Sequence, residues 1–349
     1  MSYSNEISER IIKSNSTILQ ALKKMDAINK KLLLVFEDNK FLGVLSIGDI
    51  QKAIIGNISL ETFVQTIMRK DFLFAKISDD KKSILNLMQQ YRIECMPILD
   101  ESANLVSLYM WDDVFSSEKR SDGLKINLPV VIMAGGEGTR LKPLTNIIPK
   151  PLIPINDKTI IERIMDKFIE VGCNEFFLSV NYKADMIKYY FSNTNYSIMF
   201  IQEDQPLGTA GSLHLLKGKI NSTFFVTNCD ILIDQDINSI LEYHKQNKNE
   251  ITLVAALKHY PIPYGIVETT HEGLLKKITE KPEITFKINT GLYILEPNLI
   301  DDIPANRRFD ITDLIAELLK GNKKVGVFPV SEKSWRDIGD WNEYKQILK

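Results

Sequence analysis

A glycine-rich string directly after a short apolar strand is the feature that most constrains the fold of this chain. The run Pro129 to Ala134 is apolar, and it leads into Gly135-Gly136-Glu137-Gly138-Thr139-Arg140. Glycines let backbone amides come close to an anion, and α/β folds place such turns at the end of a strand. The dinucleotide fingerprint would need glycine where Leu141 stands, and the Gly-Lys-Ser or Gly-Lys-Thr of the Walker loop is absent. The string therefore predicts an α/β domain with a phosphate loop of another type.

The same string continues with Pro143-Leu144-Thr145 and Pro149-Lys150-Pro151-Leu152. Loop amides, the planar fork of Arg140 and the point charge of Lys150 are suited to converge on one triphosphate. The whole string resembles the signature of the sugar-phosphate nucleotidyltransferases, the nucleoside-diphosphate-sugar pyrophosphorylases. The resemblance implies that Arg140 and Lys150 are catalytic. It also implies that the loop binds nucleotide through Ala134, Gly135, Gly136, Glu137, Gly138 and Thr139.

Two later segments resemble the base-reading and metal-binding parts of this family. The base-reading segment would bind the nucleotide through Gln202, Pro206, Leu207, Gly208 and Thr209. The apolar strand Phe224 to Val226 leads to Asp230, and Asp337 lies in a late Asp-x-Gly segment. The resemblance implies that both aspartates bind Mg²⁺, an ion that takes few carboxylates and completes its shell with phosphate oxygens. The family commonly has Thr after the glycine of this segment, where Asp340 stands here.

Three further segments resemble the sugar-binding parts of the family, in the family's order. The implied sugar-binding residues are Asn228, Gly265, Glu280 and Asn289, and Lys281 is implied as a catalytic residue that contacts the sugar phosphate. Taken alone, Glu280 and Lys281 are typical of a solvated turn before Pro282. Because the three segments occur in the family's order, we assign Glu280 and Lys281 to the site. The resemblance covers residues 128–345.

The N-terminal part contains an internal repeat with the order helix, strand, turn, strand, helix. The copies span about residues 6–57 and 66–117, and they resemble a tandem pair of CBS (cystathionine-β-synthase-type) motifs, which implies an adenosine nucleotide site. Ser46 and Asp49 fit the family's ribose contact. In the second copy Met110 stands at the hydroxyl position when Asp113 is aligned with Asp49. The alternative for Ser46 and Asp49 is a helix N-cap pair.

These observations predict two domains joined by a polar linker. We expect a small α+β tandem CBS module at 1–118, a linker at 119–127 and a Rossmann-like α/β nucleotidyltransferase domain with a mixed, mostly parallel sheet at 128–349. Both domain families commonly pair, which implies a homo-oligomer.

Composition excludes several other classes. The 43 Lys and Arg against 45 Asp and Glu leave a net charge of −2, which predicts no nucleic acid or membrane partner. No apolar stretch reaches the roughly 20 residues that a membrane span requires, and the polar N-terminus lacks a signal core. Three cysteines without CxxC spacing predict neither disulfides nor a zinc site. We expect a cytoplasmic protein.

The implied reaction joins a sugar 1-phosphate to a nucleoside triphosphate with Mg²⁺ as cofactor, giving a nucleotide sugar and pyrophosphate. A CBS pair in front of this domain resembles the guanylyltransferases of bacterial nonulosonate (legionaminic acid) routes, which implies GTP and glucosamine 1-phosphate as substrates and GDP-glucosamine as product. Mannose or heptose 1-phosphate and other bases stay open. A different class, the non-catalytic regulatory subunit with a nucleotide-sensing CBS pair, is the other alternative.

Overall fold

The computed structural model describes residues 5–38, 40–91, 95–110 and 125–347. The chain divides into two compact units, Met1–Asp122 and Gly123–Lys349. The expected linker, 119–127, falls partly outside the described residues. Within the described part of the chain, none of the helices combines the length and the apolar character that crossing a membrane requires.

Unit 1 contains two three-stranded sheets of the same construction, with strand orders β1-β2-β3 and β4-β5-β6. In each sheet the first two strands are parallel and the last two antiparallel. The main elements are α1 (Asn5–Arg10), β1 (Ile11–Lys13), α2 (Ile18–Ile28), β2 (Leu32–Glu37), β3 (Lys40–Ser46), α3 (Ile47–Ile55), β4 (Ala75–Lys76), α4 (Lys81–Tyr91), β5 (Cys95–Leu99) and β6 (Leu105–Met110). The predicted order of helix, strand, turn, strand and helix is present in the first copy as α2, β2, β3 and α3, and the second copy follows it through α4, β5 and β6 as far as the described residues reach. Asp113, which the alignment of the two copies used, lies outside the described residues.

Unit 2 is built around a seven-stranded sheet with the order β11-β10-β7-β12-β17-β14-β18. Its strands are β7 (Val130–Met133), β10 (Phe176–Val180), β11 (Ile198–Gln202), β12 (Phe224–Asn228), β14 (Ile251–Pro261), β17 (Glu283–Leu295) and β18 (Val325–Ser331). Only the pairings of β17 with β12 and with β14 are antiparallel. The other neighbours in the sheet are parallel. The predicted mixed, mostly parallel sheet is therefore confirmed.

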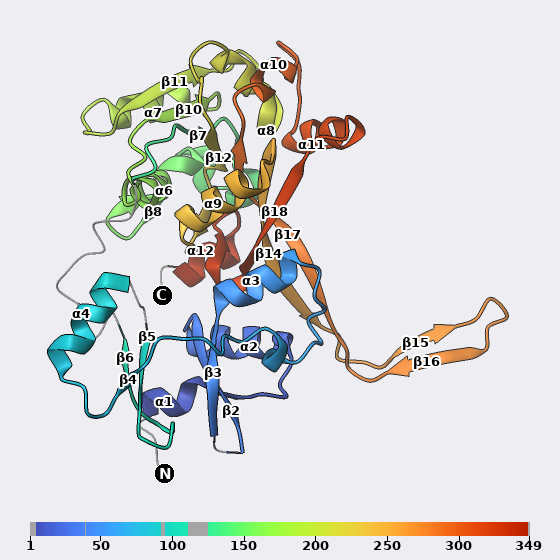
Figure 1. Ribbon diagram of the computed structural model, residues 1–349. Coiled ribbons are helices and arrows are strands. Elements are labelled where there is room, and N and C mark those ends of the chain that lie inside the picture. The colour runs from blue at the N-terminus through green and yellow to red at the C-terminus, as the bar shows by residue number, and fades with distance from the viewer. Residues whose placement is uncertain (1–4, 39, 92–94, 111–124, 348–349) are drawn as a thin grey trace. The chain divides into compact units, whose positions relative to one another are not determined.

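Helices cover both faces of this sheet because its strands are apolar on both sides (Figure 1). Val130 and Ile132 of β7 face one core, while Val131 between them faces the other. The first face is covered by α6 (Ile160–Ile169), α7 (Ala184–Phe191), α9 (Ile237–Asn247) and α12 (Trp341–Ile347). The second is covered by α8 (Gly208–Gly211), α10 (Leu299–Asp302) and α11 (Ile311–Lys320).

The start of α6 shows how local sequence sets an element in place. Thr159 accepts a hydrogen bond from the amide of Glu162, and the Glu162 carboxylate accepts from the amide of Thr159. This capping box satisfies two donors that the first turn leaves free, and such a cap stabilises a helix by about 1 kcal/mol. Ile160, Ile164 and Phe168 then follow at helical spacing and are buried against the sheet.

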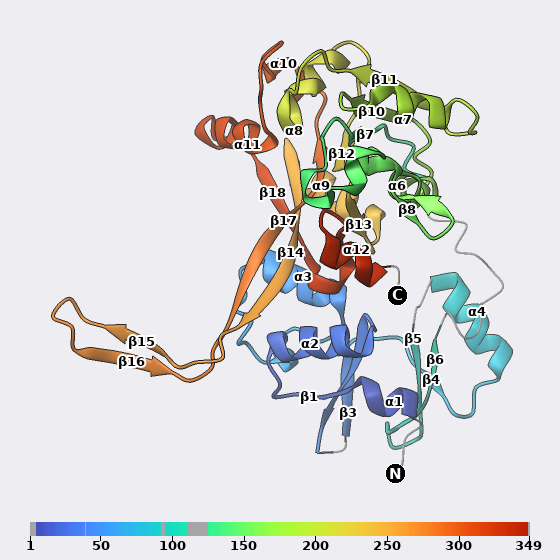
Figure 2. The same ribbon diagram turned by 180° about the vertical axis from the view of Figure 1, so that it is seen from behind.

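Three small strand pairs complete unit 2. They are β8 (Pro154–Ile155) with β9 (Lys158–Thr159), β13 (Ile231–Ile233) with β19 (Trp335–Asp337), and β15 (Ile266–Thr269) with β16 (Leu275–Thr279). The β15–β16 hairpin extends away from the large sheet, as Figures 1 and 2 show from opposite sides. The β13–β19 pair joins two segments that are distant in the sequence, and both carry residues of the candidate site.

Candidate active site

Most of the predicted site residues of unit 2 lie where the large sheet changes direction. From β7 the chain moves outward through β10 to β11, and β12 is then added on the other side of β7. Because these four strands are parallel, their carboxyl ends lie at one edge of the sheet. Open α/β sheets bind ligands at such a switch point. Gly135, Gln202 and Asp230 stand at or just beyond the ends of β7, β11 and β12.

Glycines shape the loop that follows β7. Gly138 has a φ of +65°, and a Cβ added there would lie 2.9 Å from Cγ2 of Thr145 and 3.0 Å from Cβ of Lys150. A Cβ on Gly135 would lie 3.1 Å from Oε1 of Glu203. At Gly136 no heavy atom comes within 4 Å of such a Cβ. The loop is therefore packed against Glu203 at Gly135 and against its own segment at Gly138, and it borders open space at Gly136.

The other predicted nucleotide-binding residues of the loop take different positions. Ala134 is buried, and its amide donates to the carbonyl of Ser179 in β10 at 2.8 Å. Glu137 is exposed, with its carboxylate 3.8 Å from Nζ of Lys142. Thr139 begins a short 3₁₀ turn that contains Arg140. Of these three, only Glu137 and Thr139 present side chains at the surface.

Two cations and two carboxylates converge beside this loop. The Nζ atom of Lys150 donates to Oδ2 of Asp230, and both side chains are largely buried. The exposed guanidinium of Arg140 bridges the carboxylates, with Nη2 3.8 Å from Oδ2 of Asp230 and Nη1 3.5 Å from Oδ2 of Asp337. The structure therefore brings together Arg140, Lys150, Asp230 and Asp337.

The backbone pairing of β13 with β19 sets the two aspartates side by side. Ile231 stands opposite Asp337 in this antiparallel pair, and the amide of Ile338 donates to the carbonyl of Asp230 at 2.7 Å. Burial, and after it the charge of Asp230, raise the pKa of Asp337, whereas the charges of Arg140 and Lys150 oppose this shift. Oδ1 of Asp337 is buried and has no partner with hydrogen-bond geometry among the described residues, although the nearby Gly339 amide lowers the pKa of this carboxyl. An unpartnered buried carboxylate oxygen is suited to a metal ion as ligand.

A buried carboxylate links the base-reading segment to the loop. Glu203 is 6% exposed, and it accepts hydrogen bonds from Oγ of Ser179 at 2.5 Å and from the amide of Leu207 at 3.1 Å. The same carboxylate lies against Gly135. Glu203 thus holds the phosphate loop and the base-reading segment in one arrangement. Its neighbour Gln202, at the end of β11, is exposed and accepts a hydrogen bond from Nζ of Lys188 at 2.8 Å.

The rest of the base-reading segment is held by Asp310. Its Oδ1 accepts from the amide of Thr209 at 2.9 Å. Gly208 has a φ of +82°, and a Cβ there would lie 2.6 Å from Oδ1 of Asp310. Leu207 is buried, and its carbonyl accepts from the amide of Phe309, whereas Pro206 is exposed. The short helix α8 begins at Gly208, directly after these contacts.

Two amides of the predicted sugar-binding set lie close together at the end of β12. The side chain of Asn228 packs directly against Gly291, whose φ of +86° and lack of Cβ leave room for it. The amide of Gly291 donates to Oδ1 of Asn289 at 3.1 Å, and Nδ2 of Asn289 donates to the hydroxyl of Tyr293 at 2.7 Å. Asn228 and Asn289 therefore belong to one polar group next to Asp230.

The other predicted sugar-site residues lie at the base of the β15–β16 hairpin. Oε2 of Glu280 would be 2.9 Å from a Cβ on Gly265, so these two residues are in contact. Lys281 follows with a φ of +42° and is exposed. Across the described residues, no ion pair or hydrogen bond links Glu280 or Lys281 to Asp230 or Asp337. The structure does not join this hairpin group to the cluster beside the loop.

In unit 1, Ser46 and Asp49 form the cap of α3. The Ser46 amide and Oγ donate to Oδ2 of Asp49 at 2.9 and 2.6 Å, and Ser46 Oγ accepts from the amide of Asp49 at 3.3 Å. Oδ1 of Asp49 accepts from Nε of Arg69 at 2.6 Å. In the structure Ser46 and Asp49 thus form a helix N-cap pair, as in the alternative interpretation. Both oxygens of the Asp49 carboxylate accept hydrogen bonds from protein donors.

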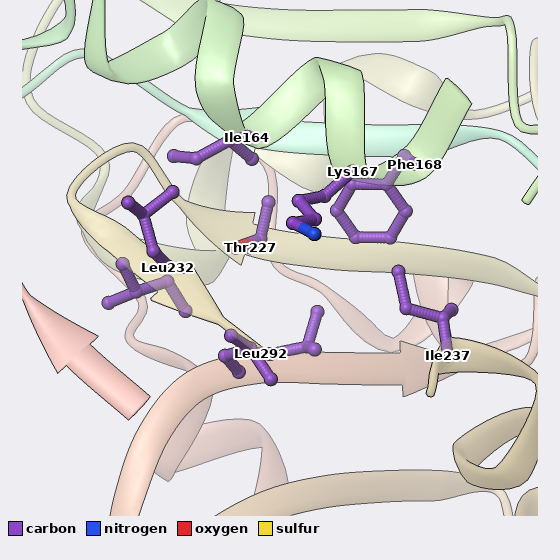
Figure 3. A pocket seen from close by; sticks show the side chains of 9 residues that line it. Ile164, Lys167, Phe168, Thr227, Leu232, Ile237 and Leu292 are labelled. Atoms are coloured by element: carbon purple, nitrogen blue, oxygen red, sulfur yellow. The ribbon is translucent and has the colours of Figure 1, made fainter. Parts of the chain in front are cut away.

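The described part of unit 2 also contains an apolar pocket, lined in part by Thr227 and Ile231, which are the chain neighbours of Asn228 and Asp230 (Figure 3). Ile164 and Phe168 of α6 face Leu232 of β13 and Leu292 of β17 across it. None of the residues predicted to bind nucleotide, sugar or metal lines this pocket. We therefore place the candidate site at the loop and not at the pocket.

Four residues that contact predicted site residues were missed from the sequence: Lys188, Glu203 and Asp310 in unit 2, and Arg69 in unit 1. Each acts on a predicted residue from another segment, as Asp310 does on Thr209 across 101 residues. Glu203 had a usable signal, because an acidic residue directly after an apolar strand stands at the ligand-binding edge of a parallel sheet. The other three have no local signal.

Comparison with known proteins agrees with this arrangement. A family model described as nucleotidyl transferase matches residues 129–349, and a CBS domain model matches residues 9–56 and 64–118. The chain is 33% identical over 225 residues to a mannose-1-phosphate guanyltransferase of Pichia angusta, covering 61% of each chain. It is 32% identical over 228 residues to one of Schizosaccharomyces pombe, covering 62% of each. The chain thus spans about three-fifths of the length of these relatives.

The chain is also similar to a solved structure. HddC from Yersinia pseudotuberculosis, complexed with GMP-PN, is 29% identical, with a TM-score of 0.50 over 63% of this chain and 98% of that chain. The family match spans the sheet, the glycine loop and the aspartates that the structure gathers at its switch point. The chain belongs to the nucleotidyl transferase family and has CBS domains in its N-terminal unit.

Proposed function

We propose that this protein is a sugar-1-phosphate guanylyltransferase. The observation that carries the proposal is the convergence of Arg140, Lys150, Asp230 and Asp337 beside the loop of Gly135 to Gly138. Two cations and open backbone amides suit a triphosphate, and two carboxylates suit a divalent metal. The names of the relatives and the GMP-PN complex of HddC support guanine as the base.

In the proposed reaction an oxygen of the sugar 1-phosphate attacks the α-phosphorus of GTP in line. The bond from the α-phosphorus to the bridging oxygen breaks, and its electron pair leaves with pyrophosphate. No general base is required, because a phosphate monoester is largely dianionic near neutral pH. The chain therefore has to position the reactants and stabilise their charge.

Each residue is assigned a role in this reaction from its position. The loop amides at Gly136 contact the triphosphate, and Arg140, exposed at the mouth of the cluster, binds the leaving β and γ phosphates. Lys150, buried beside Asp230, binds the α-phosphate. Lys281 on the hairpin binds the sugar phosphate, and Asn228, Asn289, Gly265 and Glu280 bind sugar hydroxyls. Because Lys281 lies apart from the cluster, this last assignment requires the sugar substrate to bridge the two groups.

The residues present fit Mg²⁺. Asp230 and Asp337 would hold it, and the buried Oδ1 of Asp337 is suited to be a ligand. An ion held by two carboxylates takes its other ligands from phosphate oxygens and water. When bound, the ion supplies positive charge that stabilises the transferring phosphoryl group.

Three sugar 1-phosphates are candidate substrates. The combination of a CBS pair with this catalytic domain favours glucosamine 1-phosphate, which would yield GDP-glucosamine for a nonulosonate (legionaminic acid) route. The names of the relatives favour mannose 1-phosphate instead. Heptose 1-phosphate is the third candidate.

The test is pyrophosphate release with Mg²⁺ across GTP, UTP, CTP, dTTP and ATP against the 1-phosphates of glucosamine, mannose, glucose, N-acetylglucosamine and heptose. We expect activity with GTP and one of the first two sugars. Activity with another base would overturn the guanylyl assignment and keep the reaction. No activity in folded protein would favour a non-catalytic regulatory subunit.

For the CBS unit we propose adenosine nucleotide binding only on the condition that Arg69 releases Asp49. A ribose needs the carboxylate that Arg69 now occupies. AMP should therefore raise the melting temperature of Arg69→Ala more than that of the wild type. Equal shifts in both proteins would remove Asp49 from any nucleotide site.

A further inference from the structure

The side-chain amide of Gln202 is held in one orientation by a lysine from the neighbouring helix. Gln202 ends β11, and Lys188 lies in the last turn of α7. Nζ of Lys188 donates to Oε1 of Gln202 at 2.8 Å. The nitrogen of the same amide, Nε2, has a described partner only in the carbonyl of Glu203, at a long 3.4 Å.

This contact decides which end of the amide is available to a ligand. An ammonium group has three donors and no acceptor, so only the oxygen of the amide can face Lys188. The NH₂ group must then point away from Lys188. Its two hydrogens have one weak protein partner between them. Gln202 therefore presents a hydrogen-bond donor, at an exposed position on the ligand-binding edge of the sheet.

The donor is fixed relative to the phosphate loop as well. Glu203, the next residue, is buried and lies against Gly135. The Gln202 backbone therefore has little freedom to move away from the loop. A nucleotide whose phosphates lie along the loop would meet a preset donor at this edge.

We propose that Lys188 is a positioning residue that sets base selection by turning the Gln202 donor toward the nucleobase. The proposal rests on the proposed function, in which Gln202 faces the base. Guanine O6 and the O4 of uracil and thymine are acceptors, whereas adenine N6 and cytosine N4 are donors. The fixed Gln202 donor can form a hydrogen bond with the acceptor of guanine, uracil or thymine. In adenine or cytosine it would face another donor. Lys188 thus selects GTP, UTP and dTTP against ATP and CTP, and other contacts choose among the first three.

The test compares Lys188→Met with the wild type. Methionine keeps the length of the side chain and removes the ammonium, so the Gln202 amide becomes free to rotate. The ratio of kcat/KM for GTP to that for ATP should fall by on the order of tenfold, the scale of discrimination that one misplaced hydrogen-bonding group causes. The Kd values of GTP and ATP are also measured by calorimetry without sugar phosphate, and their ratio should show the same loss of preference for GTP.

A second variant reverses the expected preference. Gln202→Glu has nearly the same shape, and its carboxylate still accepts from Lys188 but offers only an acceptor to the base. It should favour ATP and CTP over GTP. Lys245→Met is the matched control, because Lys245 is an exposed lysine in the last turn of α9 and loses the same charge. Its ratio should stay within about twofold of the wild type.

The outcomes separate this inference from the proposed function. If the wild type binds no nucleoside triphosphate, the proposed function and this inference are both overturned. If the wild type prefers GTP and Lys188→Met keeps the same ratio, only the role of Lys188 is overturned. A fall in the ratio for Lys188→Met without one for Lys245→Met supports it.

Discussion

Lys150 and Asp230 form an ion pair between segments 80 residues apart, and their side chains are only 9% and 13% exposed. Each is assigned a ligand in the proposed reaction, Lys150 a phosphate and Asp230 a metal ion. In the structure each neutralises the other. When substrate and metal bind, the phosphate must therefore replace Asp230 as the partner of Lys150, and the metal ion must replace Lys150 as the partner of Asp230. Arg140 lies 3.8 Å from Asp230 and 3.5 Å from Asp337, so it is a second cation beside both carboxylates.

Lys150→Ala tests the phosphate role. Loss of a buried cation aimed at the transferring group should lower kcat by on the order of 100-fold. Asp230 keeps Arg140 as a neighbour, so the variant should still fold, which its melting temperature checks. Lys142→Ala is the control, because Lys142 lies in the same segment and its side chain forms an ion pair, among the described residues, only with exposed Glu137. Wild-type turnover by Lys150→Ala would remove Lys150 from the mechanism.

Asp230→Asn tests the metal role. The amide removes one of the two negative charges that attract the ion, so half-maximal activity should require at least about tenfold more Mg²⁺. Asp340→Asn is the control, since Asp340 accepts from the amides of Asn342 and Glu343 at the start of α12, and asparagine caps a helix as well. An unchanged Mg²⁺ requirement in Asp230→Asn would place the ion on other residues.

Two glycine substitutions should separate binding from folding. Gly136→Ala adds a methyl group to open space, so the melting temperature should stay near that of the wild type. The methyl group would occupy the approach to the loop amides and raise the KM for GTP by on the order of tenfold. Gly208→Ala should instead lower stability by about 2 kcal/mol or more, because its φ is +82° and Asp310 leaves no room. Unchanged KM in Gly136→Ala would contradict the loop as the phosphate site.

Cys173 gives a pH-dependent prediction. Burial raises the pKa of its thiol from 9.0 to about 11. Between these values the native thiol keeps its proton while the unfolded thiol loses it, so stability falls as pH rises through this window. The loss is on the order of 2 kcal/mol, at 1.36 kcal/mol per pKa unit. Between pH 9 and pH 11, the free energy of urea unfolding should decrease less for Cys173→Ala than for the wild type. Equal decreases in both proteins would contradict the raised pKa of Cys173.

Much of the candidate site could be predicted because its residues lie in continuous strings at strand ends. The loop after β7, the segment after β11 and Asp230 after β12 each follow an apolar strand in the sequence. In a parallel sheet the carboxyl ends of strands meet at one edge, so their proximity follows from the fold class.

The partners of these residues could not be predicted in the same way. Lys188 reaches Gln202 across 14 residues, and the contact depends on how α7 packs beside β11. Asp310 reaches Thr209 across 101 residues through side-chain geometry alone. The hairpin group at Gly265 and Glu280 was assigned to the site by order in the sequence, and order does not give the distance of a projecting hairpin from the sheet.

The antiparallel pair of β13 with β19 has a consequence for how the protein is made. The backbone of this pair sets Asp337 beside Asp230, and the indole of Trp341 donates to the carbonyl of Lys142 across 199 residues. Contacts between such distant segments form late, because the intervening chain must first be ordered. A nascent chain therefore carries the glycine loop and Lys150 long before it has a complete cluster. Until β19 has been synthesised, the ribosome-bound chain exposes a phosphate loop that lacks its second aspartate.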